Sequence, residues 1–423
     1  MIYFPFIYFS CLLFWSIYKR GYDVYAYIVS IYTISALCSI FVDALNLYSI
    51  YDIFSHPLGI VAPITYCGLL TICFQPFKSF KSNRIKSITD INERKYNIIV
   101  YTFFILFIIN LLASFTKIQD IIFNNALSSI REDFYKGRQE SIWSSYSGVF
   151  RYFIVICALV SPCSVLMILF FFVNISFLKK SIFFNCITIL GSLTKLIHSI
   201  FMADRSGFIH FIIIIGLCFI LTKKHIPKKK LKYIYLVGGL ILSILIFYIS
   251  SVTISRFGGE NGSNMESIYT SLLYYAGSSY IQFCNFFNTL SFDSPISLVP
   301  IFPLTYWILD LPSYFDQADI VENYYHHGVS NFSTFLGMIL SISGRIVMII
   351  FVATFYVISS KIIYRKKYNV ISIKKLLYFF VVALVVSNGL FGYYYMSSFS
   401  VVQILIWILI ARWIFLKRHQ TNQ

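Results

Sequence analysis

The sequence has few charged residues, and this scarcity excludes an ordinary soluble domain. Only 12% of its 423 residues are Asp, Glu, Lys or Arg, whereas soluble domains carry about 25%. Long apolar runs take their place, and the mean hydropathy is +0.76. The runs at 98–115, 152–173 and 233–249 have the length of roughly 17–25 residues that a helix needs to cross the hydrocarbon core of a bilayer. The composition therefore predicts an integral membrane protein.

Motifs of soluble enzymes are missing as well. The sequence contains no Cys-x-x-Cys pair, no Walker lysine loop, no Asp-x-Asp cluster, no His-Glu-x-x-His and no Gly-x-Ser-x-Gly. Of the nine cysteines, only Cys284 falls outside the apolar runs, where cysteine behaves as a small hydrophobic residue. We therefore expect no metal, no cofactor and no disulfide framework. Basic residues outnumber acidic ones, 34 to 17, but they are spread over many loops, which argues against a nucleic-acid partner.

The apolar pattern predicts an all-α polytopic protein with about eleven transmembrane helices in a single membrane domain, residues 1–423. The expected spans are 2–17, 24–42, 58–74, 98–115, 151–175, 182–202, 207–222, 233–252, 334–358, 376–391 and 398–416. Basic residues are concentrated in alternate loops, at 19–20, 78–95, 179–180, 223–232, 361–375 and 417–418. Most acidic residues lie in the other set of loops. The positive-inside rule then predicts an amino terminus outside and a carboxyl terminus in the cytoplasm.

Two of the expected outer loops are long, at 116–150 and 253–333. In the second loop, Ser263-Asn264-Met265-Glu266 is a capping box, which predicts that a helix begins there. Apolar residues at helical spacing continue to Leu290, and we expect this helix to lie on the membrane surface with its aromatic side down. The apolar run 298–311 is interrupted by two prolines and predicts a re-entrant or interfacial segment.

Cationic residues near the outer end of the sixth expected span form a candidate anion site. On one continuous helix, Lys195, His198, Met202 and Arg205 would fall within an arc of about 80°. Arginine binds phosphate oxygens in a fork and lysine binds them as a point charge, so a lipid diphosphate is the natural ligand in a membrane. The alternative is structural: Arg205 sits at the interface and Lys195 pairs with a buried acid.

Other polar residues in unusual places are further candidates. Arg256 begins the large outer loop and precedes Gly258-Gly259, which would let a ligand approach the backbone; the alternative is an arginine that only ends a span. Arg345 lies within the ninth span and needs a polar partner, which is a ligand or a salt bridge to another helix. Tyr280 is a packing or sugar-stacking residue. Candidates for a general base or sugar contact are Glu260, Glu322, His326 and His327.

Several short segments resemble the O-antigen polymerase (Wzy) family of bacterial polysaccharide assembly. They are Ala203-Asp204-Arg205-Ser206-Gly207 between two spans, Ser255-Arg256-Phe257, the segment 273–278, and Phe283-Cys284-Asn285. The number of spans and the late, dominant outer loop are also similar to that family. The outside amino terminus departs from the family, whose members begin inside.

The resemblance implies a GT-C-like polymerase architecture in the bacterial inner membrane, with 116–150 and 253–333 as periplasmic loops. It implies a glycosyltransferase that polymerises undecaprenyl-diphosphate-linked oligosaccharide repeat units for O-antigen, capsule or exopolysaccharide, without a metal or a nucleotide sugar. Expected partners are the lipid-linked substrate, membrane lipid, a chain-length regulator and a flippase.

In this interpretation, Arg205 and Arg256 hold the diphosphate and stabilise its charge as it leaves. Lys195 and Arg345 support them, and His198 and Tyr280 contact the substrate. The base is one of Glu260, Glu322, His326 and His327.

Three other functions share a many-span architecture. A lipid-linked oligosaccharide flippase should have short loops and symmetric halves, and a secondary transporter should have broken-helix repeats. An O-antigen ligase transfers finished chains to a lipid core.

Overall fold

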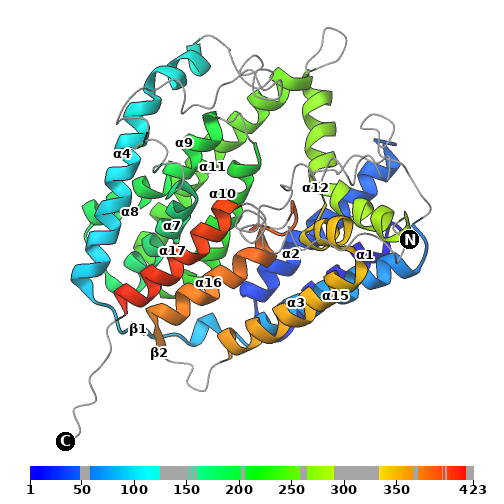
Figure 1. The fold of residues 1–423 in the computed structure, drawn as a ribbon, viewed down its shortest axis with the longest axis horizontal. Coiled ribbons are helices and arrows are strands. Elements are labelled where there is room, and N and C mark those ends of the chain that lie inside the picture. The colour runs from blue at the N-terminus through cyan, green and yellow to red at the C-terminus, as the bar shows by residue number, and fades with distance from the viewer. Residues whose placement is uncertain are drawn as a thin grey trace, which may run out of the picture. The chain divides into compact units, whose positions relative to one another are not determined.

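The computed structural model describes residues 1–47, 58–123, 152, 156, 160–201, 205–257, 264–289, 333–364, 370–392, 394–395 and 398–415, some of them by backbone alone. The described chain is mostly helical, with two short strands (Figure 1). It divides into two compact units, each built from several separate segments. Unit 1 comprises residues 1–84, 269–368 and 375–404, and unit 2 comprises residues 85–268, 369–374 and 405–423.

Unit 1 is built from helices α1 (Phe4–Arg20), α2 (Val24–Ala44), α3 (Val61–Lys78), α15 (Phe335–Ile363), most of α12 (Asn264–Thr289) and most of α16 (Ile373–Ser387). A 3-10 turn, η1 (Ser82–Arg84), follows α3. Side chains cap two of these helices: Asp23 accepts a hydrogen bond from the Ala26 amide at the start of α2, and Thr334 accepts one from the Gly337 amide at the start of α15. Such caps satisfy amides that have no partner within the helix.

Unit 2 contains α4 (Glu93–Phe123), η2 (Ser161–Val165), α7 (Leu166–Val173), a π-helical turn η3 (Asn174–Leu178), α8 (Ile182–Ser192), α9 (Thr194–Phe201), α10 (Arg205–Thr222), η4 (Lys223–His225) and α11 (Lys228–Phe257). Helix α17 (Ser398–Ile414) begins in unit 1 and ends in unit 2. Strands β1 (Ser87–Thr89) and β2 (Val370–Ser372) pair in parallel, with Ile88 opposite Ile371.

Each of the eleven expected spans contains helix, which confirms the all-α class of a membrane protein. Among the described residues, six helices are long and apolar enough to cross a membrane: Val24–Ala44, Glu93–Phe115, Ser161–Leu178, Ser206–His225, Lys228–Ser250 and Phe335–Ile363. Two further apolar helices are shorter, Ile182–Ile197 and Val401–Ile414. The count of eleven and the GT-C-like architecture remain predictions.

Two expected spans are interrupted. The sixth is divided at Leu193 into α8 and α9. The ninth, α15, has a break at Gly344, whose φ of 80° and ψ of 175° lie outside the helical region. Only glycine adopts such a backbone conformation without strain, because any side chain would clash with the neighbouring peptide. Arg345 therefore stands at the start of a second half-helix.

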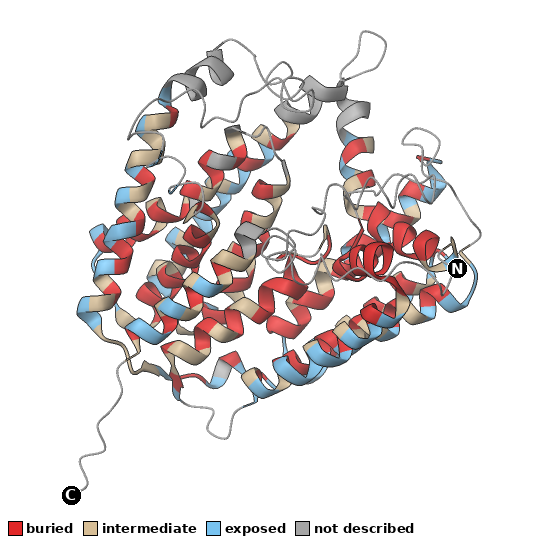
Figure 2. Cartoon of the chain, in the orientation of Figure 1, coloured by how far each residue is buried: buried red, intermediate tan, exposed pale blue. Residues whose placement is uncertain are grey.

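Helix α12 begins at Asn264, within the capping box. Its second half differs from the surface position that the sequence predicts, because residues 277–286 are buried on every face (Figure 2). The reason is close packing on α2: Ser39 donates a hydrogen bond of 2.6 Å to the Gly277 carbonyl, and Ser35 donates one of 2.6 Å to the Ala276 carbonyl. Small residues let the two backbones approach.

Loops that the charge pattern places on one side of the membrane meet within each unit. In unit 1, Arg20 at the end of α1 donates to the Lys78 carbonyl at the end of α3, and the amines of Lys19 and Lys78 lie over the Trp15 ring at 5.0 and 5.3 Å. Lys19, Arg20, Lys78 and Lys361 lie in the last turns of α1, α3 and α15, and Lys375 lies in the first turn of α16. We call these five residues the basic end of unit 1.

In unit 2, Lys180 forms an ion pair of 3.5 Å with Glu93, and the Asn92 amide donates to the Ile414 carbonyl. The amines of Lys95 and Lys374 each lie 5.5 Å from an aromatic ring, that of Trp413 and of Phe415. Within unit 2, residues 88–95, 180 and 370–374 and the end of α17 therefore lie near one another, as the charge pattern predicts for loops on one side.

Candidate functional site

The candidate anion site is positioned by α9, α10 and α11 of unit 2. Helix α9 packs on α10, and α10 packs on α11. The Phe208 ring stacks on Tyr248 with centroids 4.3 Å apart, and the Phe219 ring meets Tyr235 at 5.6 Å. Because the residue number falls along α11 as it rises along α10, the two helices form an antiparallel hairpin around η4.

Arg205 and Arg256 lie at the same end of this hairpin. Arg205 opens α10 and Arg256 is the last residue but one of α11. The stacked rings of Phe208 and Tyr248 lie level on the two helices. Arg205 is three residues from Phe208 and Arg256 is eight residues from Tyr248, both toward the end of the hairpin away from η4. At 1.5 Å per residue, they are offset by about 7–8 Å along the hairpin axis. The backbone therefore attaches both arginines near one end of the hairpin.

The opposite end of the hairpin is the turn that carries Lys223 and Lys224, both exposed. The start of α10 is also where the aligned peptide dipoles place a partial positive charge. Phosphate groups bind well at such positions, since backbone amides point toward them. The backbone and Arg205 therefore favour the same kind of ligand.

The expected single arc of Lys195, His198, Met202 and Arg205 stays a prediction, because residues 202–204 lie outside the described residues. Helix α9 is described to Phe201, and α10 is described from Arg205. Lys195 and His198 do share α9, one turn apart, and Lys195 is half-buried. Helix α10, which carries Arg205, packs on α9.

Arg345 belongs to unit 1, and its contacts are structural. Its guanidinium donates a hydrogen bond to the Phe287 carbonyl in the last turn of α12 and lies over the Phe287 ring, 4.6 Å from the centroid. Carbonyls in the last turn of a helix lack intrahelical donors, so a cation there is stabilising. The break at Gly344 brings the arginine to this position.

Tyr280 is a packing residue. Its side chain is 0% exposed, its ring meets Tyr66 at 5.2 Å, and its hydroxyl donates to the Met1 carbonyl at 3.3 Å. A sugar ring needs an accessible aromatic face, which Tyr280 does not offer.

The remaining candidates fall outside what the structure describes. Glu260, Glu322, His326 and His327 lie outside the described residues, and His198, Arg205 and Arg256 are described by their backbone alone. Within the described ranges, no group of three or more His, Cys, Asp or Glu side chains is placed to hold a metal ion.

A buried polar network escaped the sequence analysis. The Tyr96 hydroxyl donates to Asn174 Oδ1 at 2.8 Å, and Asn174 Nδ2 donates to Thr188 Oγ1 at 3.2 Å. The signal was available, because Asn174 follows an uninterrupted apolar run and a buried amide needs partners. Since these groups satisfy one another, we assign the network a structural role in joining α4, η3 and α8.

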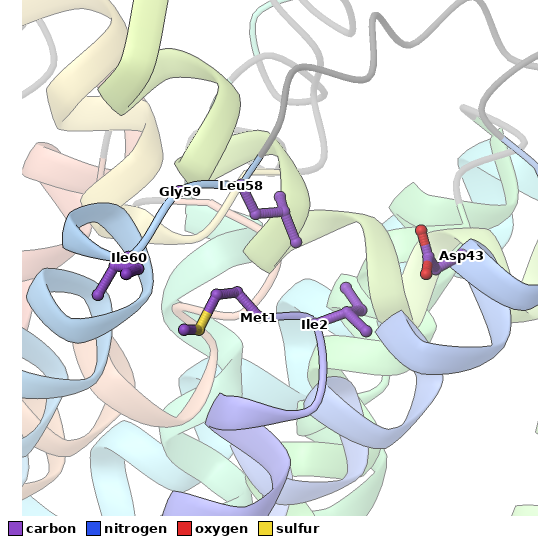
Figure 3. Close-up of a pocket in the computed structure, with 6 residues that line it drawn as sticks. All are labelled: Met1, Ile2, Asp43, Leu58, Gly59 and Ile60. Atoms are coloured by element: carbon purple, nitrogen blue, oxygen red, sulfur yellow. The ribbon is translucent and has the colours of Figure 1, made fainter.

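Unit 1 contains a cavity of about 350 Å³ near the start of α1, lined by Met1, Ile2, Asp43, Leu58, Gly59 and Ile60 (Figure 3). Asp43 is the ionisable side chain in this lining, and the lining has no lysine, arginine or histidine. The cavity therefore lacks the cationic side chains that an anion site needs.

Comparison with protein-family models, with curated proteins and with solved structures finds no match to this chain. The candidate site therefore rests on its own residues.

Proposed function

We propose that the chain is a glycosyltransferase that polymerises lipid-diphosphate-linked oligosaccharide repeat units at the outer face of a bacterial inner membrane. The observation that carries the proposal is the position of Arg205 and Arg256 at one end of the α10–α11 hairpin, away from the lysines of its turn. In a membrane protein, arginines on the side opposite to the basic loops run against the usual charge bias. A diphosphate ligand gives them a reason to be there.

The proposed orientation places the basic loops, at 19–20, 78–95, 179–180, 223–232, 361–375 and 417–418, in the cytoplasm. The amino terminus and the hairpin end with Arg205 and Arg256 then face outward, together with the loops at 116–150 and 253–333. This orientation suits a substrate that has already crossed the membrane on its lipid carrier.

The reaction is a displacement at an anomeric carbon. A hydroxyl of the acceptor unit attacks this carbon on the growing chain, the new glycosidic bond forms, and the bond to the diphosphate oxygen breaks. The hydroxyl proton passes to a base, for which Glu260, Glu322, His326 and His327 are the candidates. The leaving group is the lipid diphosphate, whose bond energy drives the transfer.

Arg205 and Arg256 would lower the barrier by stabilising charge on the leaving diphosphate. Preorganised donors of this kind contribute about 10²–10³-fold each to the rate in other enzymes. The α10 amino terminus adds its partial positive charge at the same place, and Lys195 on the neighbouring α9 adds a further cation.

The test is complementation of a deletion strain, followed by gel analysis of surface polysaccharide. Arg205→Ala should insert normally but leave a single capped repeat unit, whereas Arg205→Lys should restore part of the ladder. Lys224→Ala, an exposed cation at the other end of the same hairpin, is the matched control and should give a wild-type ladder.

Other gel patterns would contradict the proposal. A normal ladder from Arg205→Ala would remove this residue from the mechanism. A deletion strain with no capped repeat at all would indicate a flippase, and one with long chains that remain on their lipid carrier would indicate a ligase.

A further inference from the structure

One stripe of α15 is exposed along most of its length. Ile346, Ile350, Ala353, Val357, Lys361 and Tyr364 follow at spacings of three or four residues, and all are exposed. This spacing keeps side chains on one face of a helix. From Ile346 to Val357 the stripe is apolar for about 16 Å, and it then ends in one amine and one phenol. Figure 2 shows exposed residues along this helix.

A cavity of about 530 Å³ lies at the lysine end of the stripe, between the last turns of α3 and of α15. Its lining includes Gln75, Ser79, Tyr356, Ser360, Lys361 and Tyr364, all from unit 1. The lining combines one amine with hydroxyl and carboxamide groups and with aromatic rings.

The charge around this cavity is positive. It belongs to the basic end of unit 1, where the described acid Asp23 is matched by Arg20 at 3.7 Å. A second lysine adjoins the lining, because Lys375 donates a hydrogen bond to the Tyr364 carbonyl. Among the described residues, none forms a hydrogen bond or ion pair with the Lys361 amine. Its charge is therefore available to an anion.

We propose that this cavity binds an anionic glycerophospholipid, with the phosphate at Lys361 and an acyl chain along the α15 stripe. The dimensions agree, because half of the roughly 30 Å hydrocarbon core is close to the length of the apolar stripe. Basic pockets between transmembrane helices are known seats for anionic headgroups. The hydroxyls of Ser360 and Tyr364 can donate hydrogen bonds to phosphate oxygens. The apolar residues of the α15 stripe can contact an acyl chain instead of water. The site is independent of the proposed polymerase chemistry.

The test is native mass spectrometry of the full-length chain in detergent, after addition of phosphatidylglycerol or of phosphatidylcholine with the same acyl chains. Wild type should retain one phosphatidylglycerol in preference to phosphatidylcholine. Lys361→Gln should lower this retention about fivefold, the effect of one basic residue near a membrane surface, and Lys361→Arg should restore it. Lys229→Gln, which removes an exposed lysine of α11, is the matched control and should retain the lipid as wild type does.

Three outcomes would overturn the proposal: equal retention of the two lipids by wild type, unchanged retention by Lys361→Gln, or displacement of the lipid by excess inorganic phosphate. The last would indicate a phosphate site without lipid specificity. Lys361 is exposed, so its variants should elute and unfold as wild type does, and their lipid retention is directly comparable.

Discussion

Replacing Gly277 by alanine should destabilise unit 1, because α12 and α2 touch at this residue. A methyl group built on Gly277 would lie 2.5 Å from the Cys38 carbonyl carbon and 2.7 Å from the Ser39 nitrogen. Both atoms are backbone and cannot rotate away. To bring the closest contact to 3.4 Å, the two helices must separate by about 0.9 Å.

The cost follows from what this separation disrupts. Overpacking costs about 1–3 kcal/mol. The hydrogen bonds that Ser35 and Ser39 donate to α12 carbonyls contribute about 0.6 kcal/mol each in a membrane protein. Against this, alanine is favoured over glycine within a helix by about 1 kcal/mol. The net loss of unfolding free energy should be about 1–3 kcal/mol.

Gly238 is the matched control, since it is also inside a helix, α11, but has no atom within 4 Å of an added methyl group. Gly238→Ala should therefore stabilise the chain by up to about 1 kcal/mol. Unfolding of the purified protein by SDS, followed by helical circular dichroism, measures both variants. Equal stability of Gly277→Ala and wild type would refute the close packing of α2 on α12, and so would an equal loss in both glycine variants.

Two further predictions concern stability. Asn174→Ala should lower the unfolding free energy by about 1–3 kcal/mol, because the Tyr96 hydroxyl stays buried without its 2.8 Å partner. In SDS unfolding, Tyr96→Phe should therefore destabilise the Asn174→Ala variant less than it destabilises wild type. Strict additivity of the two losses would contradict the network. Asp23→Ala should cost about 1 kcal/mol through loss of the α2 cap, whereas Asp23→Asn should be nearly neutral at pH 7.

The Asp23 cap also predicts a pH dependence. Burial raises the pKa of the Asp23 carboxyl above its usual 3.8, against the opposing effects of the Ala26 amide and Arg20. Above pH 3.8 the folded chain thus keeps a proton that the unfolded chain has released. The stability from this group is present at low pH and falls as pH rises through the raised pKa. From pH 3.8 up through the raised pKa, the unfolding free energy of wild type should fall relative to that of Asp23→Asn. A rise of this difference with pH would show that the ion pair with Arg20 dominates.

The helices could be predicted from the sequence because each arises from an apolar run of sufficient length. The start of α12 was predicted from its capping box, since caps are local. The break at Gly344 could not be predicted, because the sequence on both sides of it is apolar. Gly344 gave a weak signal, but a glycine within an apolar helix is more often only a packing residue.

The contacts that define the sites are long-range, and this limits what sequence can predict. The burial of Tyr280 depends on Tyr66 and on the first residue of the chain, which are far apart in sequence. The capping of α12 by Arg345 depends on a break that places the guanidinium beside Phe287. The sequence predicts that Arg345, within a span, needs a polar partner, but the partner in the structure includes a helix end, which no charge pattern predicts.

The two groups of cations in this chain require different explanations. In the proposed orientation, lysines of the cytoplasmic loops follow the charge bias of membrane insertion, and neighbours hold some of them, as Glu93 holds Lys180 and Trp413 holds Lys95. The same orientation gives no such reason for Arg205 and Arg256, where a cation works against this bias. Retaining them there costs insertion energy unless a ligand compensates. A membrane-embedded diphosphate offers two anionic groups on one molecule, and in the proposed function Arg205 and Arg256 would each bind one of them.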